Sequence, residues 1–148
     1  RGLVGSEMCI RDRDKRQPKE IAMPSVEEMQ VRETIQTYFD SMFESKADKV
    51  HRAFHPNARI SGDTPQGFFE MTVADFASFV EAQPAAREAG EIPFLEVLSL
   101  DVHGQTAVAR VRDDYIGNRY LDTLSFVKTG DRWSIYNKLF HIEGPAGG

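Results

Sequence analysis

The chain has 148 residues, a formal net charge of −5 and 41% hydrophobic residues, which fits one domain with a core of its own. An acidic chain without clusters of Lys and Arg is a poor candidate for nucleic-acid binding. No apolar run is long enough to span a membrane, and the residues before Met23 lack the apolar region of a signal peptide. We therefore expect a cytoplasmic protein that binds neither nucleic acid nor membranes.

Residues 1–22 are expected to be a non-native or disordered leader. The segment 1–13 resembles the translation of a transposase sequencing adaptor, and such scars are excluded from fold reasoning. Whether residues 14–22 are native stays open. Cys9 is the only cysteine and lies in this leader, so we expect no disulfide and no cysteine nucleophile in the domain.

The first half of the domain carries the signals of three helices. A capping-box pattern at residues 25–28 starts the first helix, and apolar residues follow at helical spacing through Met42. A second, short helix is predicted over residues 47–54. It ends before Pro56, because the residue that precedes a proline avoids the helical conformation. Thr72 is the predicted N-cap of the third helix.

Strands are predicted in the rest of the domain, where apolar residues alternate with polar ones. Two are short, at residues 58–61 and 67–71, and lie between the second and third helices. The others form a meander over residues 94–102, 106–115, 120–128 and 132–140, with turns at His103-Gly104, Gly117-Asn118 and Thr129-Gly130-Asp131.

Helices followed by an antiparallel meander predict one α+β domain over residues 23–143. We expect N-terminal helices packed on a curved, mainly antiparallel sheet, which together form a cone with an internal pocket. A flexible tail is predicted at residues 144–148. The sequence shows no internal repeat and no linker that would divide this domain.

The last hairpin places two polar side chains on its apolar face. If the alternation is unbroken on both sides of the turn, the following residues share that face: Leu124, Phe126, Trp133, Ile135 and Leu139, together with Asp122 and Asn137. A carboxylate and an amide on an apolar face are either a buried structural pair or the floor of a pocket.

The opposite, convex face of the sheet is half apolar. The alternation assigns to it Lys138, Tyr136, Phe140, Leu121, Thr123 and Val127, with Arg110 and Arg112 among them. A face of this kind is typical of a homodimer surface. The alternative is a solvated face with long side chains that extend their charges into water.

A second carboxylate is predicted beside the first. If Gly117-Asn118 is a two-residue turn, Tyr115 pairs with Tyr120 and Asp113 lies opposite Asp122. Two opposed carboxylates repel each other, so one should have a raised pKa, as general acid–base chemistry requires. In the alternative, Asp113 lies at the solvated rim of the sheet. A slip of one residue would move it to the other face.

The histidines offer one candidate site residue. His51 and His55 are four apart and would share a helical face, but Pro56 frays the helix and no third ligand lies close in sequence, so no metal site is predicted. His55 follows a core position where the helices meet the mouth of the sheet. It is either a base or hydrogen-bond donor of the pocket, or a residue that bonds the backbone at a helix end.

Aromatic side chains are abundant for so small a domain, and core packing explains most of them. A cone leaves part of its core hollow, so we expect Tyr38, Phe54, Phe76 and Trp133, together with Asn137, to bind the ligand. The Tyr38 hydroxyl needs a partner if it is buried, and it is a candidate donor to a ligand oxygen.

Several short patterns resemble the nuclear-transport-factor-two-like superfamily, the cystatin-like cone. These are Ile35-x-x-Tyr38, Phe54-His55-Pro56, Leu98-x-Leu100-Asp-Val-x-Gly104-x-Thr-Ala107, Tyr120-x-Asp122-x-Leu124 and Lys128-x-Gly130-x-Trp133-x-Ile135-x-Asn137-Lys138. The resemblance covers residues 25–142 and is greatest to small bacterial proteins called "putative lumazine-binding" and to the polyketide-cyclase-like group. It implies a homodimer and a pocket inside the cone, but no particular reaction.

The sequence therefore predicts a protein that binds a small molecule in its pocket, with three alternatives for its role. The first is a cofactor-independent isomerase, cyclase or dehydratase, in which Asp122, with His55 or Asp113, moves a proton while Tyr38 and Asn137 hold the substrate oxygen. The second is a ligand carrier or sensor without turnover. The third is a structural dimerisation domain. No phosphate loop, dinucleotide fingerprint or Ser-His-acid set is present, and no cofactor is predicted.

Overall fold

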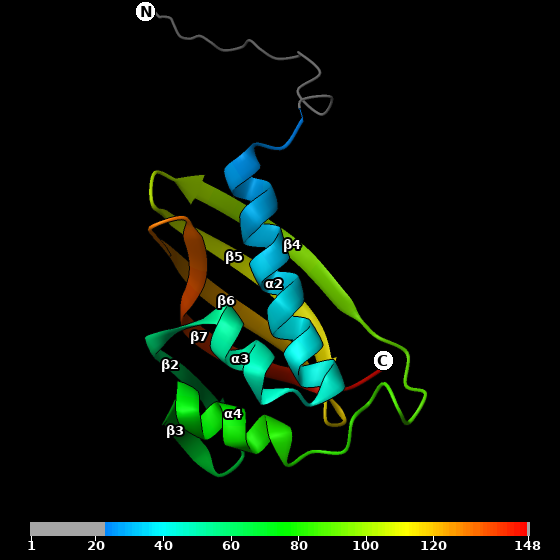
Figure 1. The fold of residues 1–148 in the computed structure, drawn as a ribbon. Coiled ribbons are helices and arrows are strands. Elements are labelled where there is room, and N and C mark those ends of the chain that lie inside the picture. The colour runs from blue at the N-terminus through cyan, green and yellow to red at the C-terminus, as the bar shows by residue number, and fades with distance from the viewer. Residues whose placement is uncertain (1–22, 148) are drawn as a thin grey trace, which may run out of the picture.

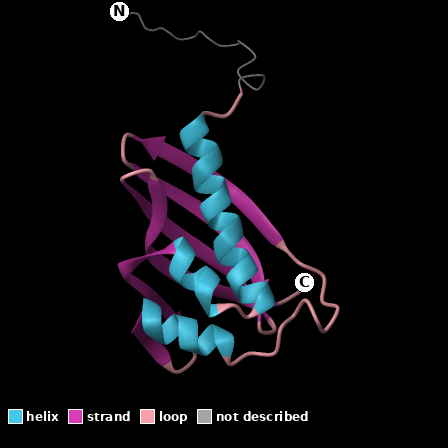
Figure 2. Cartoon of the chain, in the orientation of Figure 1, coloured by secondary structure: helices cyan, strands magenta, loops and turns pink. Residues whose placement is uncertain are grey.

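A computed structural model describes residues 23–147 and shows three helices packed against one face of a six-stranded sheet (Figures 1 and 2). The elements are α2 (Val26–Glu44), α3 (Ala47–Ala53), β2 (Phe54–Thr64), β3 (Gly67–Thr72), α4 (Val73–Glu81), β4 (Leu95–His103), β5 (Thr106–Tyr115), β6 (Asn118–Thr129) and β7 (Arg132–Pro145). The α+β prediction is confirmed. The predicted leader, with Cys9, lies outside the described residues.

The strands are arranged in the order β3-β2-β7-β6-β5-β4. All neighbours are antiparallel except β2 and β7, which run parallel. The long helix α2 crosses the face of the sheet, while α3 and α4 lie at the end formed by β2 and β3 (Figure 1). The helices therefore cover one face of the sheet, and the other face carries no helix among the described residues.

Local signals account for the ends of the helices. The Ser25 hydroxyl accepts a hydrogen bond of 3.0 Å from the backbone N–H of Glu28 at the start of α2. Thr72 and Asp75 form a reciprocal capping box at the start of α4. The helix α3 ends at Ala53, one residue before the predicted end, and Phe54 already begins β2 ahead of the His55-Pro56 pair.

A β-bulge in β7 reverses the predicted faces of its second half. Opposite β6, the register shifts by one residue between Ile135 and Asn137, which leaves Tyr136 without a partner. The side chains from Asn137 to Ile142 therefore point to the face opposite to the predicted one, up to a second shift at Glu143. Lys138 and Phe140 are buried under the helices, so their predicted placement on the convex face is wrong.

Two further predictions about β7 differ from the structure. Asn137 and Leu139 point away from the helices and are exposed, so neither belongs to the apolar inner face that the unbroken alternation predicts. The strand β7 also continues to Pro145, which pairs with Asn118. The predicted tail therefore contains the last two residues of a strand.

The core fills the space between α2, α3, α4 and the inner face of the sheet. Its largest side chains that are almost completely buried include Tyr38, Phe54, Ile35, Met42 and Ile60. At about 25 cal/mol per Å² of buried apolar surface, such aromatic and branched side chains supply most of the favourable free energy of folding. Over residues 23–147, no helix is long and apolar enough to cross a membrane.

Candidate functional site

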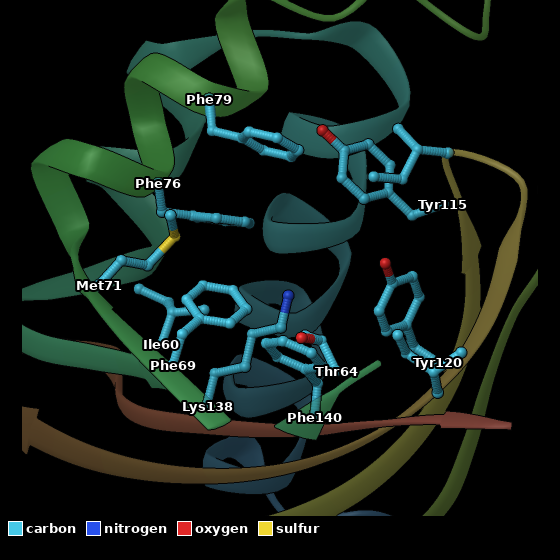
Figure 3. A pocket seen from close by; sticks show the side chains of 12 residues that line it. Ile60, Thr64, Phe69, Met71, Phe76, Phe79, Tyr115, Tyr120, Lys138 and Phe140 are labelled. Atoms are coloured by element: carbon cyan, nitrogen blue, oxygen red, sulfur yellow. The ribbon is translucent and has the colours of Figure 1, made fainter. Parts of the chain in front are cut away.

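A cavity of about 120 Å³ lies between α4, the β2–β3 hairpin and the ends of β5, β6 and β7. It is lined by Ile60, Thr64, Phe69, Met71, Phe76, Phe79, Tyr115, Ile116, Tyr120, Lys138, Phe140 and Ile142 (Figure 3). Most of these side chains are apolar. Hydroxyl groups of threonine and tyrosine and one ammonium group supply the polar atoms, which is the usual composition of a small-molecule pocket.

The ammonium group belongs to Lys138, which extends from the sheet into the middle of the cavity, between Phe76 and Tyr120 (Figure 3). Its Nζ lies 4.6 Å from the ring centre of Phe76, 4.8 Å from that of Tyr38 and 5.8 Å from that of Phe140. These contacts stabilise a cation through the negative faces of the rings. Among the described residues, no oxygen accepts a hydrogen bond from this Nζ, so the amine is available to a ligand.

One wall of the cavity depends on a glycine in β2. The ring of Phe140 lies so close to Gly62 that a Cβ atom at this position would overlap it. Phe140 also packs against Phe69 and Tyr120, with ring centres 5.6 Å apart in each case. The absence of a side chain at Gly62 therefore allows this aromatic wall to form.

Two carboxyl groups are buried on the inner face of the sheet, behind the side chains that line the cavity, and neither of them lines it. Asp113 and Asp122 are 1% and 0% exposed, and the Tyr38 hydroxyl donates a hydrogen bond of 2.6 Å to Oδ2 of Asp122. Of the other carboxyl oxygens, Oδ2 of Asp113 and Oδ1 of Asp122 have no hydrogen-bond donor within residues 23–147 as long as both groups are ionised. Buried oxygens of this kind are costly unless they share a proton or bind a ligand.

Burial determines the protonation of this cluster. It raises the pKa of Asp113 well above its usual value, and the charge of Asp122 and a hydrogen bond with it act in the same direction, while the charge of Lys138 opposes them. Burial also raises the pKa of Tyr38 well above its usual value, followed by the charges of both carboxylates. Tyr38 is thus a permanent hydrogen-bond donor, and Asp113 is a candidate general acid.

The strand register places these groups on one diagonal of the inner face. Asp122 lies opposite Phe140 of β7, and Lys138 lies opposite Leu124, two residues further along β6. On the other side Asp113 lies opposite Tyr120, again two residues from Asp122. Lys138, Asp122 and Asp113 therefore step across β7, β6 and β5, at the spacing where long side chains on neighbouring strands interact.

Asp113 does not lie directly opposite Asp122, as the predicted register requires, but it does lie on the predicted face of the sheet. The turn between β5 and β6 is Ile116-Gly117, both with positive φ, so Tyr115 pairs with Asn118 instead of Tyr120. Positive φ at both central residues is the conformation of a type I′ turn. The predicted register is wrong by two residues, and since side chains alternate with a period of two, Asp113 still shares the inner face with Asp122.

A family model described as "Putative lumazine-binding" matches residues 26–141. The chain belongs to this family. The match covers all the helices and strands above except the last residues of β7. A comparison with curated proteins finds no match.

Solved structures show that the fold of this lumazine-binding family member is NTF2-like. An NTF-2 like protein of unknown function from Silicibacter pomeroyi DSS-3 is 22% identical, with a TM-score of 0.71 over 82% of this chain and 100% of that one. An NTF2-like protein of unknown function from Shewanella baltica OS155 is 19% identical, with a TM-score of 0.71 over 82% and 98%. A domain with a cystatin-like fold from Nostoc punctiforme is 16% identical, with a TM-score of 0.64 over 80% and 78%.

The aromatic residues predicted to bind the ligand lie in three different places in this family member. Phe76 lines the cavity, and Phe54 lies behind it, with its ring 5.7 Å from those of both Tyr38 and Phe76. Trp133 lies elsewhere: its Nε1 donates a hydrogen bond of 2.8 Å to Glu27, beside a polar groove between α2 and the β6–β7 turn.

His55 is not among the residues that line the cavity. It begins an irregularity in β2, where the register against β7 is interrupted between Phe54 and Arg59. Its Nδ1 accepts a hydrogen bond of 3.0 Å from the backbone N–H of Asn57, and its ring packs edge-on against Tyr136 at 5.1 Å. This geometry matches the alternative in which the histidine bonds the backbone at a helix end.

The most important cavity residue that the sequence patterns miss is Lys138, since the alternation assigns it to the outer face. Tyr115 and Tyr120 are missed as well, although they face the cavity. Over the described part of the chain, no group of three or more His, Cys, Asp or Glu side chains is placed to hold a metal ion.

Proposed function

We propose that the protein binds a small organic ligand, about one ring in size, in the cavity above Lys138. A cavity of about 120 Å³ is smaller than the roughly 300–1,000 Å³ of pockets for drug-sized ligands. It is close to the roughly 150 Å³ of an engineered apolar cavity that holds benzene. Phe69, Phe76 and Phe79 offer apolar ring faces to such a ligand.

The observation that carries this proposal is the Lys138 ammonium. It lies at 5% residue exposure among aromatic rings, and no acceptor from residues 23–147 takes a hydrogen bond from it. A ligand oxygen would satisfy this donor, so an aromatic or alicyclic carboxylate or ketone is the class that fits best. A protein whose cavity serves packing alone would be more stable with an apolar side chain at this position.

The test measures ligand-dependent stability of the wild type and of Lys138→Met, which keeps an unbranched chain and removes the charge. Benzoate, phenol, cyclohexanone and lumazine are titrated, because a ligand that binds the folded state raises the melting temperature with its concentration. We expect benzoate to stabilise the wild type and to bind Lys138→Met at least about tenfold more weakly, a loss of about 1.4 kcal/mol.

Lys128→Met is the matched control, since Lys128 pairs with Glu27 at 3.0 Å and lies outside the cavity. It should bind benzoate like the wild type. If no compound stabilises the wild type, the structural dimerisation domain is favoured. Binding that Lys138→Met does not weaken would contradict the proposed role of the ammonium.

A second candidate is acid–base catalysis on the bound ligand, as in an isomerase, cyclase or dehydratase. The specific observation in its favour is the buried Asp113–Asp122 pair beside the cavity, with two carboxyl oxygens that lack partners among the described residues. One carboxyl that holds a proton and one that accepts it can move a proton to and from a ligand carbon next to a carbonyl.

This candidate is tested by hydrogen–deuterium exchange at the carbon next to the carbonyl of cyclohexanone, followed by NMR. Asp122→Asn can still accept from Tyr38, so it should remain folded while the exchange rate falls to that of the buffer. Exchange that is unchanged in Asp122→Asn, or equal to the buffer rate in the wild type, favours a carrier or sensor. A variant that unfolds assigns Asp122 a structural role.

A further inference from the structure

We propose that Lys138 is a nucleophile that forms an imine with a small aldehyde or ketone in the cavity. This inference rests on the proposed ligand cavity and adds a covalent step to it. The primary amine lies inside an apolar cavity and its Nζ points into the middle of the space (Figure 3). Lysines in hydrophobic pockets are the side chains that proteins use for imine chemistry with carbonyl compounds.

The first supporting observation is that the amine makes no hydrogen bond within the described chain. Two other lysines are engaged by carboxylates: Lys49 donates to Glu44 at 2.6 Å and Lys128 to Glu27 at 3.0 Å. The Lys138 amine instead contacts only ring faces, at 4.6–5.8 Å. No ion pair has to be broken before a carbonyl carbon approaches Nζ.

The second observation is the proton-transfer partner. Asp122 lies one diagonal step from Lys138 on the inner face, and Asp113 one step beyond it. Tyr38 joins the two groups, since its ring lies against the Lys138 amine and its hydroxyl donates to Asp122. Imine formation needs a group that takes a proton from the ammonium and later returns it, and the carboxyl pair on the same face is the candidate for this role, with a water molecule to carry the proton because no carboxyl oxygen of the described residues pairs with Nζ directly.

The proposed step balances without a redox partner. The carboxyl pair takes one proton from the ammonium, and the free amine attacks the carbonyl carbon, so that a carbon–nitrogen bond forms while one N–H proton moves to the carbonyl oxygen. The pair then returns its proton to this hydroxyl, which leaves as water, and a protonated carbon–nitrogen double bond remains. The net change is ammonium plus carbonyl to iminium plus water.

The cavity also indicates the class of the carbonyl compound. Its volume and aromatic walls fit one ring, and the hydroxyl of Tyr115, a lining residue, is buried without a partner in the described structure. A second polar group on the ring could pair with this hydroxyl. We therefore expect aromatic or alicyclic aldehydes and ketones, and among them those with a hydroxyl or second oxygen on the ring.

The experiment uses the wild-type full chain, so that folding of a variant does not limit it. Benzaldehyde and 4-hydroxybenzaldehyde are added with sodium cyanoborohydride, and the benzylated lysines are located by peptide mapping. Labelling of Lys138 should be at least about tenfold faster than labelling of the exposed Lys46, because the cavity holds the aldehyde beside the amine. Benzoate should slow the labelling of Lys138 and leave that of Lys46 unchanged.

A second readout does not depend on entry of the reductant. Native mass spectrometry without cyanoborohydride should show a species heavier by one aldehyde minus one water, which is absent in Lys138→Arg. If Lys138 is labelled no faster than Lys46 and this species is not seen, the imine proposal is overturned. Benzoate binding in the thermal assay would then still support the non-covalent ligand cavity, so the two proposals fail separately.

Discussion

At the scale of single residues, the inner face of the sheet holds three ionisable side chains where an apolar face is expected. Asp113, Asp122 and Lys138 are all at most 5% exposed. One proton on the carboxyl pair leaves the cluster with one negative and one positive charge, which is the arrangement that costs least in a buried site. The cluster should therefore be visible in the pH dependence of stability.

We expect the free energy of unfolding to decrease as the pH rises, with Asp113 as a cause. The folded pKa of Asp113 is raised by burial, so its contribution is complete below the unfolded pKa of about 3.9. It is lost as the pH rises through the raised folded pKa. Urea unfolding between acidic and alkaline pH should show a flatter profile for Asp113→Asn than for the wild type.

The neighbouring residue Asp114 is the control, because its pKa is shifted in the opposite direction. A hydrogen bond with Arg119 lowers the pKa of Asp114, so its contribution is present above the unfolded pKa and is lost in acid. Asp114→Asn should therefore lose stability at neutral pH and leave the alkaline slope unchanged. An Asp113→Asn profile as steep as that of the wild type would contradict the assignment.

A second prediction concerns the hydroxyl of Tyr38. Tyr38→Phe removes the donor to Asp122 at 2.6 Å and leaves a further carboxylate oxygen buried without a partner. We expect a loss of about 1–3 kcal/mol in the free energy of unfolding, measured with urea. Tyr136→Phe removes a hydroxyl from a side chain that is 47% exposed and should change little; equal losses in both variants would assign the Tyr38 effect to packing alone.

At the scale of elements, the contact between β2 and β7 determines the shape of the cavity. The bulge at Tyr136 turns Phe140 inward, and Gly62 of β2 leaves the room that this ring occupies. Two small irregularities, the bulge at Tyr136 and the glycine at position 62, therefore produce the aromatic wall of the cavity. It also makes the two positions energetically dependent on each other.

We predict that Gly62→Ala is destabilising by about 1–3 kcal/mol, because the new methyl group overlaps the ring of Phe140. Phe140→Leu should relieve part of this overlap, so the double variant should lose less than the sum of the single losses in a double-mutant cycle. Gly144→Ala, whose Cβ meets no atom within 4 Å, is the control and should be neutral. Additive losses would show that the Phe140 ring is not the cause.

The helices and most strands could be predicted from the sequence, because local caps and alternation specify them. The bulge could not, since nothing local marks Tyr136, and its cost is offset by contacts that form only in the folded sheet. The turn at Ile116-Gly117 was missed for a similar reason. Positive φ is unfavourable for a β-branched residue such as Ile116, so the sequence favoured Gly117-Asn118.

The candidate site was accordingly predicted only in part. Tyr38, Asp113, Asp122 and Phe76 were placed on or near the inner face by patterns that the structure retains. Lys138 was assigned to the wrong face by one inserted residue, although it is the side chain on which both proposals rest. Alternation predicts faces reliably only up to the first bulge.

At the scale of the whole molecule, the sheet face opposite the helices is open and partly apolar. Val108 of β5 is 44% exposed and Leu139 of β7 is 49% exposed on this face. The corrected face has lost Lys138 and Phe140 and gained Asn137 and Leu139, so it is less basic than the sequence predicts. It remains the surface on which we expect a second copy of the chain to pack.

We predict a homodimer that Val108→Glu and Leu139→Glu weaken, because each places a carboxylate on the apolar face. Light scattering coupled to size-exclusion chromatography over a range of concentrations should show a shift of both variants towards the monomer. Ile92→Glu changes a side chain that is 88% exposed in a loop and should leave the distribution unchanged. A wild type that is monomeric at all concentrations would refute this prediction.

The parallel pairing of β2 with β7 has a consequence for synthesis of the chain. β7 follows the other described strands in the sequence, yet it lies between β2 and β6, so the hairpin of β2 and β3 has no sheet to join until β7 has left the ribosome. Contacts between segments so distant in sequence form slowly. The nascent chain should therefore remain sensitive to proteases until β7 has emerged, and then acquire its cavity and its core in one step.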